Sequence, residues 1–197
     1  MNNINIIEFI KKSPKAELHL HIEGTLEPEQ MFSLAKRNNV KIPFKNINEA
    51  KKAYNFSNLE SFLKIYYEGA KVLLKEKDFF ELTWAYALKC KEDNIIHTEI
   101  FFDPQTHTTR GISFDIVING IYKALKKAEK EFGLSFKIIM CFLRHLSEQE
   151  CFKILDQAII HKDKIFGVGL DSSEMGNPPK KFEKLFKKAA ENNFITV

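Results

Sequence analysis

Two histidines, His19 and His21, lie two residues apart in the segment AELHLHIEG, residues 16–24. Alternate side chains of a β-strand point to opposite faces, so both imidazoles are expected to share a face with Glu17 and Glu23. Neutral imidazole is the most common nitrogen ligand for zinc and related ions. The spacing therefore predicts part of a metal site, although a solvent-facing edge strand would show the same pattern.

Strand-like segments alternate with helical ones along the chain, and these elements must position the histidines. Strands are expected at residues 16–22, 95–102, 136–143 and 165–170, with a fifth beginning in FITV at 194–197. Helices are expected at about 6–12, 28–37, 58–74 and 78–92, from Phe114 to the stop at Gly133, after the capping residue Ser147, and around Phe182 to Ala189. Such alternation indicates right-handed βαβ units and a parallel sheet with covered faces.

The alternation stops at Val197, in the middle of the expected fifth strand. A parallel strand normally continues into a loop and a helix that returns the chain to the other end of the sheet. We therefore expect residues 1–197 to form a single domain whose fold is incomplete at its C-terminal end.

Polar side chains follow each expected strand, where parallel α/β folds gather their functional groups. In chain order these are His19, His21 and Glu23, then Asp103, Gln105, His107 and Arg110, then Arg144 and His145, then Asp171, Ser172, Ser173 and Glu174. Their convergence favours the metal interpretation of the two histidines. Asp103 and Asp171 could equally cap turns or helices, and Arg144 is expected to hold a neighbouring carboxylate.

Composition is that of an ordinary globular domain: 197 residues, 44% of them hydrophobic. The formal charge of +4 comes from lysines spread among acidic residues, so nucleic-acid binding is disfavoured. The sequence contains no run of about 18 apolar residues, the length that would predict a membrane span. The three cysteines form no CxxC pair, which fits a reducing compartment, and Cys90 and Cys141 are expected to be buried thiols. We therefore expect a cytoplasmic protein that binds neither nucleic acid nor membrane.

Four blocks of the sequence closely resemble the metal-dependent adenosine and adenine deaminases of the amidohydrolase superfamily. They are PKAELHLHIEGTLEPE, FFDPQTHTTRG, CFLRHLSEQE and VGLDSSEMGNPP, in that order. The last three are similar to the adenine deaminase branch, and the resemblance covers essentially the whole chain. It implies a TIM (β/α)8 barrel, present here as an incomplete barrel of about the first five strands.

The resemblance also implies a reaction. One zinc ion, bound by His19 and His21 at the end of the first barrel strand, would lower the pKa of a water molecule towards about 7. The resulting hydroxide would attack C6 of adenine and release hypoxanthine and ammonia, a step of purine salvage. The position of Glu23 is typically aspartate in adenosine deaminases, where it contacts the sugar, so glutamate is consistent with a free base. The expected substrate-binding residues are Glu23, Asp171, Ser173 and Glu174.

The family also has a third zinc histidine, a glutamate proton donor, another histidine and an aspartate pair from later strands. None of these can be matched up to Val197, so we expect no catalytic residue among the 197 and no activity of the chain by itself. Two alternatives stay open. One is an adenosine or modified-purine deaminase, and the other is a short non-catalytic product that binds a partner through its open sheet.

Overall fold

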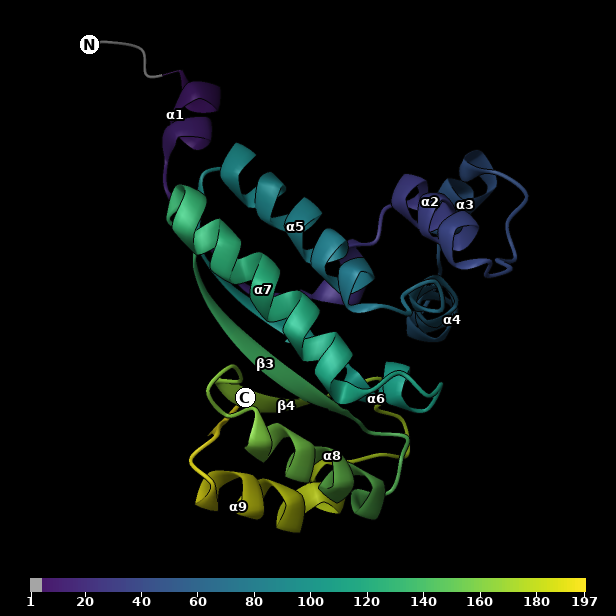
Figure 1. The fold of residues 1–197 in the computed structure, drawn as a ribbon, viewed down its shortest axis with the longest axis vertical. Helices are drawn as coiled ribbons and strands as arrows, with labels where there is room; N and C mark the ends of the chain where they lie inside the picture. Colours follow the sequence, from purple (N-terminus) through teal and green to yellow (C-terminus); the bar gives the residue numbers. More distant parts are fainter. Residues whose placement is uncertain (1–4) are drawn as a thin grey trace.

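A five-stranded parallel sheet forms the centre of the structure, a computed structural model that describes residues 5–197 (Figure 1). Its strands are β1 (Lys15–His21), β2 (Ile95–Phe102), β3 (Ser135–Leu143), β4 (Gly167–Asp171) and β5 (Ile195–Thr196). Each strand pairs in parallel with the next one along the chain, in the order β1-β2-β3-β4-β5. This sequential order is that of a (β/α) barrel, whereas a doubly wound sheet reverses direction at a switch point.

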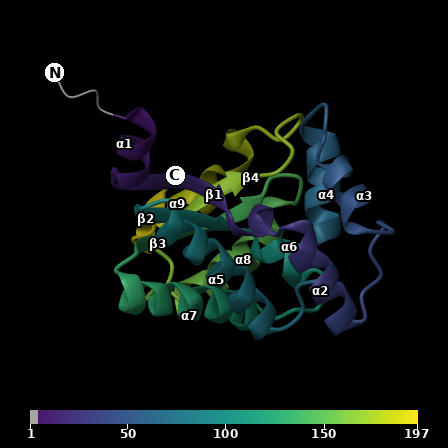
Figure 2. The ribbon, with the colours of Figure 1, turned by 90° about the horizontal axis from the view of Figure 1, so that it is seen from above.

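Helices connect the strands. They are α1 (Ile6–Lys12), α2 (Pro28–Asn38), α3 (Ile47–Ala53), α4 (Leu59–Ala70), α5 (Glu76–Glu92), α6 (Pro104–Thr108), α7 (Phe114–Phe132), α8 (Glu148–Ile160) and α9 (Glu183–Glu191). Short 3-10 helices cover Ile22–Thr25 and Pro179–Phe182. Figures 1 and 2 show α5 and α7 side by side, and α2, α3 and α4 grouped together away from α8 and α9.

The two faces of the sheet pack into separate clusters. On β2, Ile100 and Phe102 join the large core made with the helices, whereas Phe101 joins a small cluster with Ile139 and Cys141. Alternate residues of a strand point to opposite faces, so the small cluster marks the inner face of the barrel sheet. The inner face carries the functional side chains described below.

The expected strands are confirmed with small shifts of their ends. The second runs over Ile95–Phe102 as predicted, and the fourth begins at Gly167, two residues later than expected. The helix expected at 58–74 ends at Ala70. Residues 47–53 and 104–108 form α3 and α6, where no helix was expected.

The first strand differs from the expectation at a position that bears on the site. It ends at His21, and the 3-10 helix Ile22–Thr25 follows, with the backbone N–H of Leu26 donating to the carbonyl of Glu23. The expected alternation therefore stops before Glu23. Instead of sharing a face with the histidines, Glu23 turns into the interior, where it is 3% exposed.

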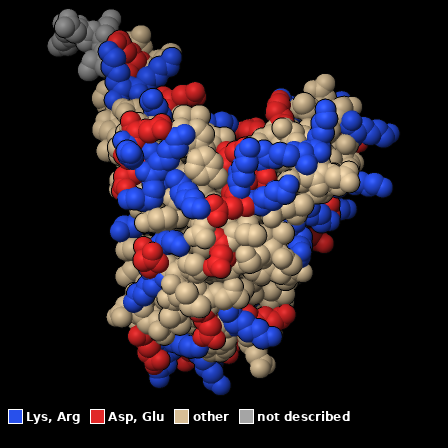
Figure 3. Space-filling model, viewed as in Figure 1, with Lys and Arg blue, Asp and Glu red and all other residues tan. Residues whose placement is uncertain are grey.

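Basic and acidic side chains are interspersed over the face of the molecule drawn in Figure 3. This mixture agrees with the pattern of charges along the sequence. Within residues 5–197, no helix combines the length and the apolar character that a membrane crossing requires.

Candidate functional site

Side chains from three strand ends meet at the carboxyl edge of the sheet. Nδ1 of His21 lies 3.6 Å from Oδ1 of Asp103 and 3.6 Å from Oδ2 of Asp171. Sγ of Cys141, on the inner face of β3, completes a group whose potential ligand atoms all lie within 4.8 Å of one another. The sequence predicted the approach of His21, Asp103 and Asp171, because the carboxyl ends of parallel strands share one edge.

The two carboxyl groups of this cluster are electrostatically unsatisfied. Oδ1 of Asp103 and Oδ1 of Asp171 are buried and have no hydrogen-bond partner among the residues that the structure describes. Burial raises the pKa of Asp171, and repulsion from Asp103 raises it further. Burial also acts to raise the pKa of Asp103, but its interactions with the neighbouring His21 and Asp171 outweigh burial and lower that pKa. A positive charge placed here would stabilise both groups.

Phe101 holds the two predicted metal ligands side by side. Its ring stacks against His19 at 4.4 Å and against His21 at 5.2 Å between centroids, and the two imidazole centroids are 5.5 Å apart. Nδ1 of His21 faces the carboxyl groups, so a metal bound by this ring would use Nε2. His19 is absent from the group of potential ligand atoms within 4.8 Å of one another, so joint binding of a metal by the two histidines stays a prediction. A carboxylate behind a ligating imidazole is the usual outer support of a metal site. Imidazole nitrogens beside unpartnered carboxylate oxygens fit a divalent cation.

A cavity of about 380 Å³ opens in front of His19 and His21. Asp171 and Ser172 line it on the sheet side, and helix α4 supplies an apolar wall through Leu59, Phe62 and Leu63 and a polar group through Tyr66. The volume lies within the range of small-molecule sites, which are mostly apolar with a few polar groups that fix orientation. The cavity therefore suits a small, flat ligand with polar edges.

Glu23 lies behind this cavity and is absent from its lining. Its carboxylate accepts hydrogen bonds from Nε2 of His107 (3.0 Å) and from the backbone N–H of Asp103 (3.1 Å), and the hydroxyl of Tyr66 lies 3.1 Å from it. The same tyrosine hydroxyl lies 2.7 Å from Oδ2 of Asp103. The structure thus places Glu23 in a buried polar network, and its contact with a substrate stays a prediction.

Ser173 and Glu174 are also outside the cavity lining. The carboxylate of Glu174 pairs with the guanidinium of Arg144, which confirms that this arginine holds a neighbouring carboxylate. Ser172 takes the place beside the cavity, and its hydroxyl is 2.8 Å from the hydroxyl of Tyr67 and 3.0 Å from Nδ1 of His145.

Three residues of the site carry no sign of a functional role in the sequence. Tyr66 lies within the helix expected at 58–74 and Phe101 within the strand expected at 95–102, and Cys141 is a buried thiol, as expected. Burial raises the pKa of Cys141 well above its usual range. Phe101 could have been found from the pairing of β1 with β2, in which it lies opposite His21. The proposed capping role of Asp103 is wrong, since its side chain makes no capping hydrogen bond to α6.

The sequential parallel sheet and the polar group at its carboxyl edge define the class of protein: an α/β barrel of the metal-dependent amidohydrolase type. The model of the adenosine deaminase family matches residues 14–197, and the chain belongs to that family.

Individual relatives sharpen this assignment. The adenine deaminase of Psychrobacter cryohalolentis is 62% identical over 192 residues, which cover 98% of this chain and 58% of that protein. The adenine deaminase of Wolinella succinogenes is 65% identical over 179 residues, 91% of this chain and 54% of that protein. The crystal structure of adenine deaminase from Arthrobacter aurescens matches with a TM-score of 0.90 at 45% identity, covering 93% of this chain and 56% of the other. The predicted family and fold class are confirmed, and the chain spans little more than half the length of these relatives.

Proposed function

We propose that this chain forms the N-terminal part of an adenine deaminase, a single barrel domain that converts adenine and water to hypoxanthine and ammonia in cytoplasmic purine salvage. The observation that carries the proposal is the pair His19 and His21, stacked on Phe101 beside unpartnered carboxylate oxygens at the mouth of a cavity of suitable volume. The high identity to adenine deaminases supports the choice of substrate.

In this proposal His19 and His21 hold zinc, and Asp103 and Asp171 support the ring of His21 from behind. Zinc, when bound, lowers the pKa of a water molecule so that a nucleophile is available at neutral pH. The chain's own residues position the base. The apolar wall of α4 covers the faces of a flat ring and excludes water, and Asp171 offers a polar group to its edge.

Part of the reaction lies outside these residues. The proton donor and the further metal ligands that the family uses have no counterpart between residues 1 and 197. We therefore propose that the 197-residue chain binds zinc but does not turn over adenine. Substrate contacts by Glu23, Ser173 and Glu174 remain predictions.

A chimaera tests the proposal. Residues 1–197 are joined to the C-terminal part of the Psychrobacter cryohalolentis enzyme, the product is loaded with zinc, and ammonia release from adenine and from adenosine is measured. We expect turnover of adenine in strong preference to adenosine. His21→Asn should abolish both zinc binding and turnover, whereas the control His97→Asn, on the opposite end of β2, should change neither.

Three results would contradict parts of this proposal. A folded, zinc-loaded chimaera that prefers adenosine would overturn the choice of substrate. A folded chimaera that retains zinc equally well after His21→Asn would overturn the metal assignment. Hypoxanthine formation by the 197-residue chain alone would show that the proposed division of the catalytic groups is wrong.

A further inference from the structure

A buried polar network links the end of helix α4 to the carboxyl edge of the sheet, and the proposed function leaves its two outer members without a role. His107 has no exposed surface, and its ring lies between Glu23 and Arg110. Nε2 of His107 is 3.0 Å from Oε1 of Glu23, and Nδ1 is 2.9 Å from Nη2 of Arg110. Both residues come from the block FFDPQTHTTRG.

The arginine determines which ring nitrogen carries the proton. A guanidinium group donates hydrogen bonds and cannot accept them, so Nδ1 of His107 must be the acceptor from Arg110. The ring proton of the neutral imidazole is then on Nε2, which donates to the carboxylate of Glu23. The edge-on packing of Phe79, with ring centroids 4.8 Å apart, holds the imidazole in this plane.

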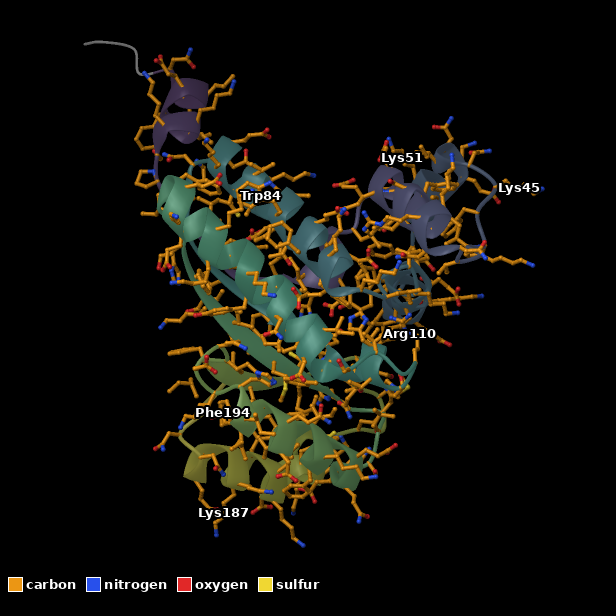
Figure 4. The ribbon with its side chains drawn as sticks, in the orientation of Figure 1. Lys45, Lys51, Trp84, Arg110, Lys187 and Phe194 are labelled. Carbon is orange, nitrogen blue, oxygen red and sulfur yellow. The ribbon has the colours of Figure 1, made fainter. Side chains whose placement is uncertain are left out.

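The same arginine fastens helix α4. Its Nη1 donates to the carbonyl of Lys71 (3.0 Å), and its Nη2 lies 3.2 Å from the carbonyls of Ala70 and Leu73. The last carbonyls of a helix lack partners within the helix, so a guanidinium at this end satisfies them. Arg110 lies beside α4 and α6 in Figure 4. It thereby fixes the end of the helix whose apolar residues form the cavity wall.

Glu23 connects His107 to the candidate metal site through hydrogen bonds. Its Oε1 accepts from His107 and from the backbone N–H of Asp103, and its Oε2 lies 3.1 Å from the hydroxyl of Tyr66. Tyr66 in turn contacts Oδ2 of Asp103, which leaves Oδ1 of that residue facing His21. A continuous chain of contacts thus runs from Arg110 to the imidazole of His21.

We propose that His107 and Arg110 are positioning residues that act through Glu23. They set the carboxyl group of Asp103 against His21, and they tie the cavity wall of α4 to the same framework. The inference rests on the proposed metal site. Loss of an outer hydrogen bond of this kind lowers the affinity for a metal by about 10–100-fold.

Two substitutions of His107 separate its two hydrogen bonds. In His107→Gln the side-chain amide reaches the place of Nε2 and can still donate to Glu23. In His107→Asn the amide lies near the place of Nδ1, so Glu23 loses that donor. The zinc affinity of the 197-residue chain is measured by titration calorimetry. We expect His107→Asn to weaken zinc binding by about 10–100-fold and His107→Gln to restore most of the affinity.

Two further measurements need no metal. Long-range proton–nitrogen NMR spectra report the tautomer of His107, and hydrogen exchange read by mass spectrometry reports the protection of α4. We expect the proton on Nε2, faster exchange of residues 66–73 in His107→Gln, which loses the acceptor for Arg110, and near wild-type exchange in His107→Asn, which keeps an acceptor at that place. His97→Asn, which changes a half-buried histidine near the start of β2, is the matched control and should leave all readouts unchanged.

The outcomes distinguish this inference from the proposed function. A proton on Nδ1, or equal exchange of α4 in the Asn and Gln variants, would overturn the positioning role. Zinc binding by His107→Asn as tight as that of the unmutated chain would overturn it as well. If the unmutated chain binds no zinc, the proposed function fails, and the tautomer and exchange results still decide whether His107 and Arg110 organise α4 and Glu23.

Discussion

His19 and His107 carry the same imidazole, but their surroundings give the two rings different uses. His107 is fully buried, with one nitrogen directed at a carboxylate and the other at a guanidinium, so neither is free for a ligand. His19 is exposed at the cavity and is held by stacking on Phe101. The ability of a histidine to bind a metal in this chain therefore depends on which nitrogens its neighbours leave available.

The three cysteines should be nearly inert in the folded chain. Burial raises the pKa of Cys90 and of Cys151 to about 11, and that of Cys141 well above its usual range. The thiolate is the reactive form, and at pH 8 only about one Cys90 side chain in a thousand is a thiolate, against about a quarter of exposed cysteines, so alkylation of Cys90 should be far slower.

Alkylation by iodoacetamide, followed by mass spectrometry, checks this expectation. The native chain should remain unmodified at pH 8 and react faster as the pH rises towards 11, because deprotonation increases with pH. The urea-unfolded chain serves as the control and should take up three labels, one for each cysteine. Rapid labelling of the native chain at pH 8 would contradict the burial of these thiols.

Among the elements, strands were easier to predict than short helices. The segment IIHTEIFF is β-branched and aromatic and is bounded by polar residues, and it forms β2 over its predicted range. Helix α3, INEAKKA, buries only Ala50. Its sequence therefore lacks the apolar residues at helical spacing from which a helix is predicted. Helix α6 is five residues long and follows Asp103 directly, which made it resemble a polar loop.

The candidate site was predictable only where its residues are close in sequence or end a strand. His19 and His21 form a local pattern on one strand, and the polar residues after the strands follow from parallel topology. Tyr66 could not be found in this way, because its approach to Asp103 depends on how α4 folds back over the sheet. The turn of Glu23 into the interior likewise depends on a 3-10 helix that alternation alone does not predict.

Helices α5 and α7 pack so closely that their contact admits only glycine at one position. A Cβ on Gly120 of α7 would lie 2.5 Å from the carbonyl oxygen of Glu76 and 2.6 Å from Cβ of Phe79. Both atoms belong to the backbone of α5 or to its first side-chain carbon, so they cannot move aside. We expect Gly120→Ala to lower the free energy of unfolding by about 1–3 kcal/mol through overpacking.

Gly69→Ala in helix α4 is the matched control. There the added Cβ would meet Leu26 and Met31 at 3.7 Å, an ordinary contact, so the change should raise stability by about 0.5–1 kcal/mol through helix propensity. Urea unfolding followed by circular dichroism measures both variants. Equal effects of the two substitutions would show that the interface between α5 and α7 can relax.

At the scale of the whole molecule, the sheet formed by residues 5–197 ends in two strands that pair on one side only, β1 and β5. Apolar side chains lie exposed on or beside these strands: Leu18 is 58% exposed, Ile195 51% and Val197 59%. A strand edge with exposed apolar residues is a template for pairing with another chain. In the relatives, which are longer, additional chain is available to cover such edges.

We therefore expect the 197-residue chain to self-associate through these edges, and the chimaera described above to associate less. Sedimentation equilibrium should give a mass that rises above 22.9 kDa with increasing concentration. Leu18→Lys should reduce the association, because a charge on an edge strand opposes pairing with a second strand. Met175→Lys, which replaces a 91% exposed apolar residue in a loop with the same charge, should not. A chain that stays monomeric throughout, or equal effects of the two lysines, would mean that the strand edges do not direct association.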